Sequence, residues 1–408
     1  MAPGSSQLHL LWLLPTLVAA TFDTLADLIS DEVVAGEDDS SDDDDEPLLA
    51  PGGGAKQLPA GRPCCCPRIP TRQKLTGEQD FMVSMVPMVA ASLAILLSRS
   101  TCFEQPLAAV ARSEVGSVAA AAGVAYAVGY LALLKAWEMV PSTVIVPCLQ
   151  LSSPMVELLE AALAPFHSAH PVLAPLSGAS LSAGSAAAFA LVFVGGVLPS
   201  VDGGAVAELC SLELWRQESM RWMMLGNIAF AVFYVLMGLA TSERAPERMS
   251  SAQFMASTNL VAVISFSCYV ATSRRLRRQF ARAYGLRRCG ASPRTARVHW
   301  LARVLSMTAE SANYVAMFAI SIAFGLHANA GLVAAARASL NQVTNCVLGA
   351  VLYRCYHFGR PVEQLGLKLL SCARTLPNLQ QPDATGADGF VLPCRTAIVA
   401  VGLLMASV

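Results

Sequence analysis

The sequence predicts an all-α protein that crosses a membrane many times. Of its 408 residues, 54% are hydrophobic and only 14% are charged, and the mean hydropathy is +0.51. Soluble domains carry far more charge than this. The apolar residues are gathered into runs long enough to cross roughly 30 Å of hydrocarbon as a helix. Because these runs lack the two-residue alternation of barrel strands, helices are the structure that satisfies the backbone in lipid.

Nine apolar runs are predicted to be transmembrane helices, near 81–98, 115–137, 141–164, 182–201, 222–241, 252–272, 304–325, 330–353 and 390–408. A tenth, weaker run at 8–29 would complete a set of about ten. Its apolar stretch is short and then carries Asp23, Asp27 and Asp31. It lacks the basic n-region of a signal peptide. Two alternatives stay open for it, a degenerate first span and a helix lying on the membrane surface.

The chain divides into an N-terminal region and two halves. Residues 1–80 hold the weak run and an acidic, proline- and cysteine-containing linker at 36–74, a composition that predicts disorder. Residues 81–201 form the first transmembrane half. A connecting loop at 202–221 leads to the second half at 222–408.

Within the linker, Asp44, Leu48 and Leu49 stand as D-x-x-x-L-L. This pattern resembles the acidic dileucine signal that sorting adaptors bind on endosomal and vacuolar membrane proteins, and a solvated acidic spacer is the alternative. Cys64, Cys65 and Cys66 precede the 81–98 run, and juxtamembrane cysteines are candidates for S-palmitoylation. Most of the twelve cysteines are scattered, which indicates small buried hydrophobes rather than a disulfide framework.

The loop at 273–303 is rich in arginine, and basic loops stay on the cytoplasmic side of a membrane. Counting spans from this loop places 62–80, 202–221 and 354–389 on the same side, so the linker is expected to be cytosolic and the C-terminus outside. The loop could also bind RNA or anionic lipid. A topogenic and lipid-facing role is favoured, and no nucleic-acid partner is predicted.

The run at 330–353 carries the strongest candidate for a solute-binding site. Arg337, Asn341, Thr344 and Asn345 follow one another at i, i+4, i+7 and i+8, which places them on one face of a helix. A charge inside the membrane costs about 2.5–3.5 kcal/mol on insertion scales, so an intramembrane arginine indicates function. Such a face suits a carboxylate, a phosphate or a hydroxyl-bearing solute.

The run at 141–164 offers a second polar stripe with Gln150, Ser153 and Glu157. Both striped runs follow another apolar run after a very short polar break, and a shift of 187 positions places Gln150 on Arg337. This shared pattern leads to the hypothesis of an internal repeat, as many secondary transporters contain. Glu310 is a candidate ion-pair partner for Arg337 or a proton-coupling carboxylate. The alternative for all these groups is that they bond neighbouring helices.

Two stretches, Tyr130 to Leu163 and Gly331 to Cys355, together with F-G-R-P from Phe358 and the closing VAVGLLMAS, resemble the drug/metabolite transporter superfamily. L-Q-L-S-S-P at 149–154 is similar to its chloroquine-resistance-transporter-like branch, and the second stretch to EamA-like members. The resemblance implies ten spans in two inverted five-helix repeats and alternating access without ATP chemistry. It also implies a central cavity lined by spans four and nine.

We therefore expect a secondary transporter that moves a small metabolite or drug-like solute, with the lipid bilayer and that solute as its partners. A homodimer is a candidate assembly. The chain has no Walker A, G-x-S-x-G or H-E-x-x-H sequence, so no enzyme activity, cofactor or metal is predicted. The alternatives are a membrane-embedded enzyme and a non-transporting scaffold or sorting protein. The expected location is an integral membrane position in an endosomal or vacuolar membrane or in the plasma membrane.

Overall fold

The structure of the protein is a computed structural model. It covers residues 11–34, 74–97, 113–140, 145, 148–149, 151–177, 211–242, 248–285, 300–326 and twelve positions between 333 and 351. These residues form helices, and no strand occurs among them; a single bridge joins Val34 to Leu75.

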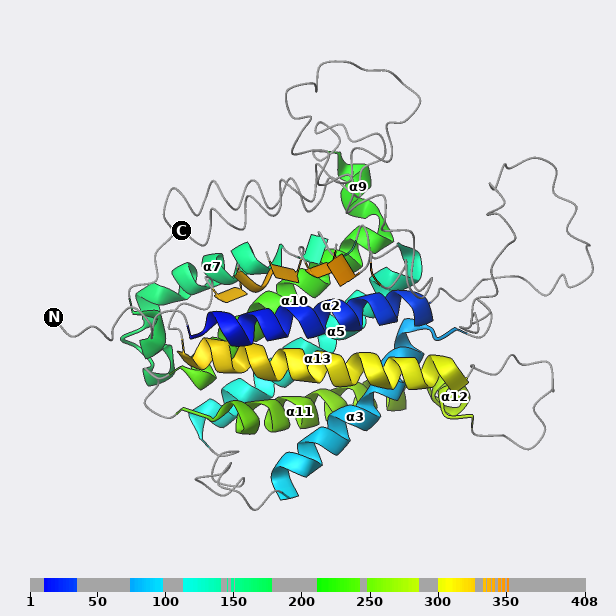
Figure 1. The fold of residues 1–408 in the computed structure, drawn as a ribbon. Coiled ribbons are helices and arrows are strands. Elements are labelled where there is room, and N and C mark those ends of the chain that lie inside the picture. Colours follow the sequence, from blue (N-terminus) through cyan, green and yellow to red (C-terminus); the bar gives the residue numbers. More distant parts are fainter. Residues whose placement is uncertain are drawn as a thin grey trace, which may run out of the picture.

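Six of the described helices are long and apolar enough to cross a membrane: α2 (Leu13–Val33), α3 (Gly77–Leu97), α5 (Glu114–Met139), α10 (Glu218–Thr241), α11 (Ser251–Thr272) and α13 (Trp300–Leu326). Figure 1 shows them gathered into one bundle. The protein is therefore an all-α, multi-pass integral membrane protein, as predicted.

The remaining expected spans are described in part or lie outside the described residues. The 141–164 run contains helical residues at 145 and 148–149 and the helix α7 (Ser152–Leu163), which two short 3-10 turns follow (Ala164–Phe166 and Pro171–Leu176). The described positions of the 330–353 run are also helical. The runs at 182–201 and 390–408 lie outside the described residues. A count of ten spans therefore stays a prediction.

The weak run at 8–29 forms part of the bundle rather than a helix on its surface. Helix α2 packs along α13, and Ala19, Ala26, Ile29 and Val33 are buried. Asp27 is also buried, with only 8% of its surface exposed. Two of the acidic residues that made this run look like a poor span, Asp23 and Asp27, are thus partly or fully buried in the bundle.

Serine side chains fix where two of the long helices begin. Ser113 accepts a hydrogen bond from the backbone nitrogen of Gly116 at 3.0 Å, which caps α5. Ser250 and Gln253 form a reciprocal capping box at the start of α11. Both caps satisfy backbone donors that a helix end leaves without an intrahelical partner.

Small residues allow the bundle to pack closely. A Cβ atom added at Gly123 would lie 2.6 Å from the carbonyl oxygen of Thr258 and 2.7 Å from Cβ of Val261, so a larger residue would push α5 and α11 apart. A Cβ atom added at Gly129 would lie 3.3 Å from Cβ of Ala229 on α10, which is also a tight contact. The segment Ala119 to Gly129 is therefore a packing face, as small residues in membrane helices generally are.

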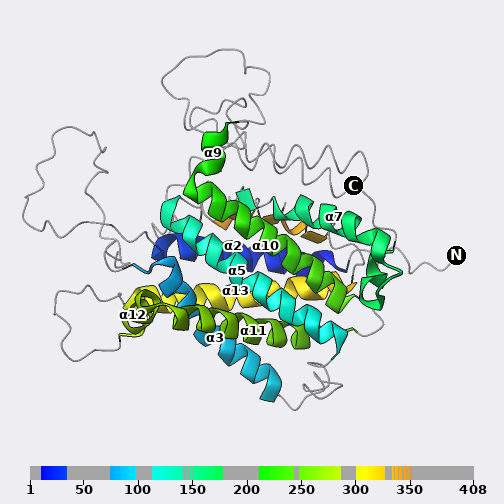
Figure 2. The same cartoon turned by 180° about the vertical axis from the view of Figure 1, so that it is seen from behind.

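Two pairs of helices make the most extensive contacts among the described elements: α5 with α10, and α2 with α13. Helix α11 packs on α5 and α3, and α3 also contacts α13. Figure 2 shows α5, α10 and α11 from behind, where they cover the rear of the bundle. These contacts leave the centre bounded by α2, α5, α7, α10, α13 and the helical residues after 333.

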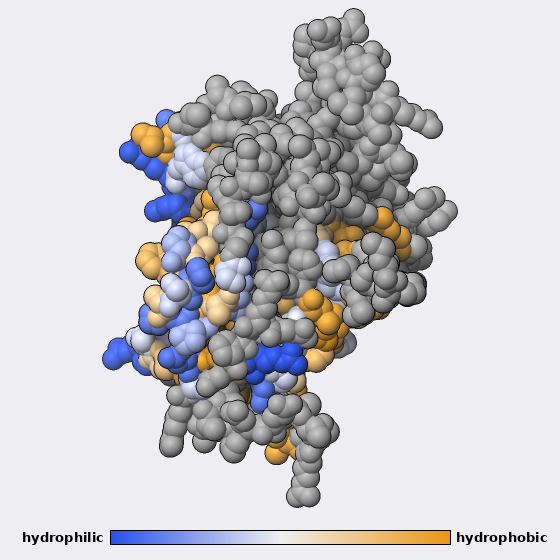
Figure 3. Space-filling model, turned by 90° about the vertical axis from the view of Figure 1, so that its left-hand side faces the viewer, coloured by the Kyte–Doolittle hydropathy of each residue, from blue (hydrophilic) through white to orange (hydrophobic). Residues whose placement is uncertain are grey.

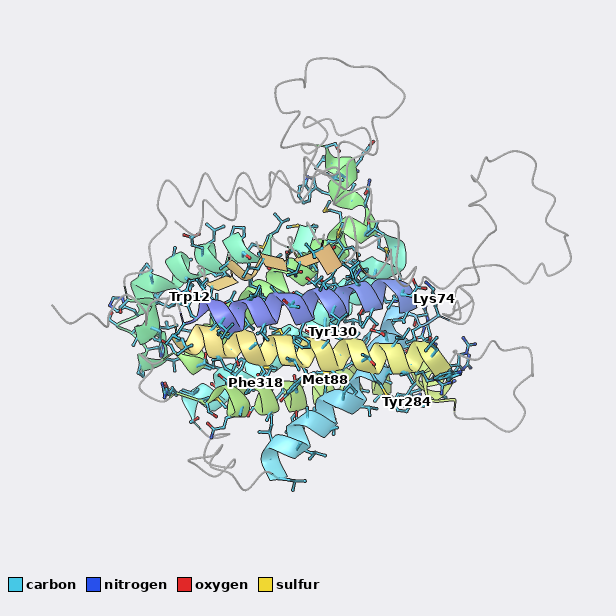
Figure 4. The ribbon with its side chains drawn as sticks, viewed as in Figure 1. Trp12, Lys74, Met88, Tyr130, Tyr284 and Phe318 are labelled. Carbon is cyan, nitrogen blue, oxygen red and sulfur yellow. The ribbon has the colours of Figure 1, made fainter. Side chains whose placement is uncertain are left out.

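One end of the bundle carries the short helix α12 (Arg274–Ala283) and is called the α12 end below. Figure 4 shows Lys74 and Tyr284 at this end and Trp12 at the opposite one. Lys135 bridges Glu78 at 2.6 Å and Glu138 at 2.9 Å here. Figure 3 looks onto the opposite end, where hydrophilic and apolar residues are mixed over the described part of the face.

Candidate functional site

A cavity of about 70 Å³ lies inside the bundle. A polar cavity needs about 10–15 Å³ to hold one water, so this cavity has room for several waters. Its wall is built from α2, α5, the 141–164 run, α10, α13 and the helical segment after residue 333. The polar side chains in the wall are Asp23, Asp27, Ser30, Tyr126, Tyr130, Trp137, Ser152, Ser153, Tyr234, Asn313, Arg337 and Asn341.

The central feature of the cavity is an ion pair between two distant parts of the chain. Nη2 of Arg337 lies 2.7 Å from Oδ1 of Asp23, and the two side chains are only 11% and 15% exposed. The other carboxylate oxygen of Asp23 accepts a hydrogen bond of 2.7 Å from Nδ2 of Asn341. Each charge thus compensates the other, which is what makes burial of either one tolerable.

Tyr234 of α10 forms the third side of this arrangement. The guanidinium of Arg337 lies over its ring, 5.1 Å from the centroid, and also donates a hydrogen bond to its hydroxyl. An aromatic face attracts a cation through its quadrupole. The guanidinium is therefore held between a carboxylate on α2 and an aromatic ring on α10.

The polar stripe predicted after residue 330 faces α2. Thr24 donates a hydrogen bond to Oδ1 of Asn341 at 2.5 Å and lies 2.7 Å from the hydroxyl of Thr344. Arg337 and Asn341 line the cavity, whereas Thr344 and Asn345 do not. The amide nitrogen of Asn345 has no partner among the described residues. Two of the four predicted residues are thus in the site, and a third holds α2 in place.

The stripe predicted on the 141–164 run is also divided. Ser153 lines the cavity and donates a hydrogen bond of 3.1 Å to the carbonyl oxygen of Ala334, which ties α7 to the segment that carries Arg337. Glu157 is half-buried and does not line the cavity. Gln150 lies outside the described residues.

Glu310 does not pair with Arg337, because Asp23 occupies that position. Only 1% of Glu310 is exposed. Its carboxylate accepts hydrogen bonds from the hydroxyl of Tyr126 at 3.4 Å and from Nδ2 of Asn313 at 3.2 Å. Tyr126 and Asn313 both line the cavity, so Glu310 lies directly behind its wall.

Asp23 and Tyr234 belong to the candidate site in the structure, but the sequence analysis did not assign them to it. An acidic residue in an apolar run is a signal, since it must find a cation or stay neutral. Asp23 was visible as such a residue, but its partner lies 314 positions later in the chain. Tyr234 gave no signal, because a tyrosine in a transmembrane helix is common.

Several predicted features cannot be placed in the site. Asp44, Leu48 and Leu49, and likewise Cys64, Cys65 and Cys66, lie outside the described residues, so sorting and palmitoylation stay predictions. Within the described parts of the chain, no group of three or more His, Cys, Asp or Glu side chains could hold a metal ion.

Comparisons with known proteins do not assign the chain to a family. A scan against protein-family models finds no match for the chain, and a search of curated proteins finds none either.

The ion pair predicts a specific pattern of stabilities. Asp23→Asn or Arg337→Gln alone should lower the free energy of unfolding by about 3–5 kcal/mol, because each leaves a buried charge without its partner. The double variant should recover most of that loss, since it removes both charges. Unfolding of the purified protein in detergent, followed by tryptophan fluorescence, measures this.

Glu157→Gln serves as the control, because Glu157 is half-buried outside the cavity; it should change stability little. A double variant no more stable than either single variant would contradict the pairing.

Proposed function

We propose that the protein is a secondary transporter that moves a small polar metabolite or drug-like solute by alternating access through the central cavity. The observation that carries this proposal is the cavity itself, with Arg337 and Asp23 buried in its wall in the middle of a membrane bundle. Ionisable residues at such depth are costly and mark solute or ion pathways in membrane proteins.

The packing of the helices supports an architecture of two five-helix repeats. Numbered in chain order, the first five expected spans are α2, α3, α5, 141–164 and 182–201, and the second five are α10, α11, α13, 330–353 and 390–408. If each span is exchanged with its equivalent in the other half, α5 is replaced by α13 and α10 by α2. The α5–α10 contact therefore corresponds to the α13–α2 contact. In the same way, the α5–α11 contact corresponds to the α13–α3 contact. All four of these helix contacts are present in the structure. This is the pattern expected where two equivalent halves pack around a pseudo-two-fold axis.

The lining of the cavity follows the same exchange. It relates α2 to α10, α5 to α13, and the 141–164 run to the 330–353 run, and each of these six contributes to the wall. Ser153 meets Ala334 where the last two come together. A binding site between the halves of a repeat is the arrangement of many secondary transporters, which favours membership of the drug/metabolite transporter superfamily.

The positions of the wall residues suggest which way the cavity faces. Ser30 and Trp137 belong to the last turns of α2 and α5, at the α12 end. Towards the opposite end, the ring of Tyr234 packs near those of Phe233 and Phe324, at 5.4 and 6.1 Å between centroids. We infer that the structure is in a state in which the cavity opens towards the α12 end. The layer formed by Arg337 and Tyr234 closes the cavity towards the opposite end of the bundle.

Transport by the reconstituted protein tests the proposal. Vesicles that contain the protein should take up one or more members of a panel of labelled amino acids, sugars, phosphorylated metabolites and drug-like cations. Arg337→Ala should reduce that uptake at least tenfold, because the variant removes the cation in the cavity wall. Glu157→Gln should transport as the unsubstituted protein does.

The double variant Asp23→Asn/Arg337→Gln separates function from folding. It should be stable yet inactive, since it keeps the fold and loses the site. Equal uptake by Arg337→Ala and the unsubstituted protein would remove Arg337 from the mechanism. No uptake of any panel member would favour a scaffold.

Glu310 is proposed as the coupling carboxylate. It is buried and bonded to two wall residues, so a change in its protonation would alter Tyr126 and Asn313 and hence the cavity. Glu310→Gln should keep exchange of solute across the vesicle membrane but lose accumulation driven by a pH gradient. Accumulation equal to that of the unsubstituted protein would contradict this role.

A further inference from the structure

Helix α12 lies across the direction of the spanning helices. Figure 2 shows it nearly end-on, whereas α5, α10 and α11 run across the same view. Ser273 separates it from α11 with an extended backbone (φ −119°, ψ 131°), so the chain turns sharply within one residue. Arg277 donates a hydrogen bond of 2.6 Å to the carbonyl oxygen of Ala271, which satisfies an acceptor at the end of α11. In a membrane-spanning bundle, α12 is thus oriented along the membrane surface.

The two faces of α12 differ in character. Leu276, Gln279 and Ala283 are buried, and the hydroxyl of the adjacent Tyr284 donates a hydrogen bond of 2.5 Å to the carbonyl oxygen of Met82 on α3. The opposite face is formed by five exposed arginines: Arg274, Arg275, Arg277, Arg278 and Arg282. No acidic residue occurs in α12. The helix is therefore amphipathic and strongly cationic, as helices that lie in a membrane interface are.

Aromatic side chains mark the depth at which α12 lies. Tyr269, in the last turn of α11, is 44% exposed, and Trp300, the first residue of α13, is 65% exposed. Both belong to the helices that flank α12 in the chain. Exposed Tyr and Trp at the ends of membrane helices lie at the level of the lipid headgroups. The arginine face is consequently at headgroup level.

We propose that α12 is an in-plane interfacial helix whose arginine face binds the headgroups of anionic phospholipids. Guanidinium groups bind phosphate oxygens with charge-assisted and often bidentate hydrogen bonds. Each basic side chain near an anionic membrane surface contributes about a fivefold gain in binding. This surface is separate from the cavity, and the inference requires only that the bundle spans a membrane.

The acidic segment at 37–46 of the same chain is a rival occupant, because it begins shortly after Val34, at the α12 end. A nucleic acid is another. The geometry favours lipid over both, since the arginine face lies at the level where headgroups are present at high local concentration.

The test uses the full-length protein purified in a neutral detergent and titrated with short-chain phosphatidylserine or phosphatidylcholine. We expect phosphatidylserine to bind at least tenfold more tightly. Arg274→Gln/Arg278→Gln should weaken that binding about 30-fold, as the loss of two surface charges implies. Arg274→Lys/Arg278→Lys, which keeps both charges, should stay within about threefold of the unsubstituted protein.

Three results would overturn the proposal. One is equal affinity for the two lipids. Another is tenfold tighter phosphatidylserine binding after Asp42 to Asp45 are replaced by asparagine, which would identify the acidic segment as the occupant. The third is displacement of phosphatidylserine by a single-stranded RNA that binds more tightly. Both arginines are exposed, so the variants should fold, and their elution on size exclusion verifies this.

Discussion

The buried contact between Asp23 and Arg337 is the interaction on which the rest of the site depends. It joins the first described span to the segment after residue 333, and Asn341, Thr24 and Tyr234 complete its hydrogen bonds and aromatic contact. Neither charge could stay in the bundle alone, because the desolvation of one unpaired ion exceeds what packing returns. The pair thus explains why an apolar run with three aspartates forms the inward-facing helix α2, and why an arginine is tolerated inside a membrane helix.

The same pair makes the centre of the bundle polar, whereas large apolar side chains such as Leu14, Leu93 and Ile264 are exposed on the long helices. Around it, Ser153, Asn313 and Tyr126 line the cavity, and Glu310 lies behind the wall. The bundle itself is held by small residues such as Gly123, where α5 and α11 approach too closely for any side chain. The proposed alternating access would need such an arrangement, in which a closely packed shell surrounds a charged centre, because the two proposed halves must move while the site between them stays intact.

The sequence predicted the class of fold and part of the site. Long apolar runs are visible residue by residue, so α3, α5, α10, α11 and α13 lie close to their expected ranges. Helical spacing also brought Arg337 and Asn341 to one face correctly. Contacts between residues far apart in the chain could not be predicted in this way. Glu310 was a candidate partner for Arg337, yet only the packing of α2 on α13 brings Asp23 there instead. Glu157 shares the helical face of Ser153 in sequence but ends outside the cavity wall.

The proposed mechanism requires the cavity to open to each side of the membrane in turn. The most direct measurement places a cysteine at Ser153, which lines the cavity, in a variant whose twelve native cysteines are replaced. Reconstituted vesicles are then treated, from the inside or from the outside, with a small, membrane-impermeant reagent that modifies thiols. Modification from both sides is the predicted result. Modification from one side only, or from neither, would contradict alternating access through this cavity.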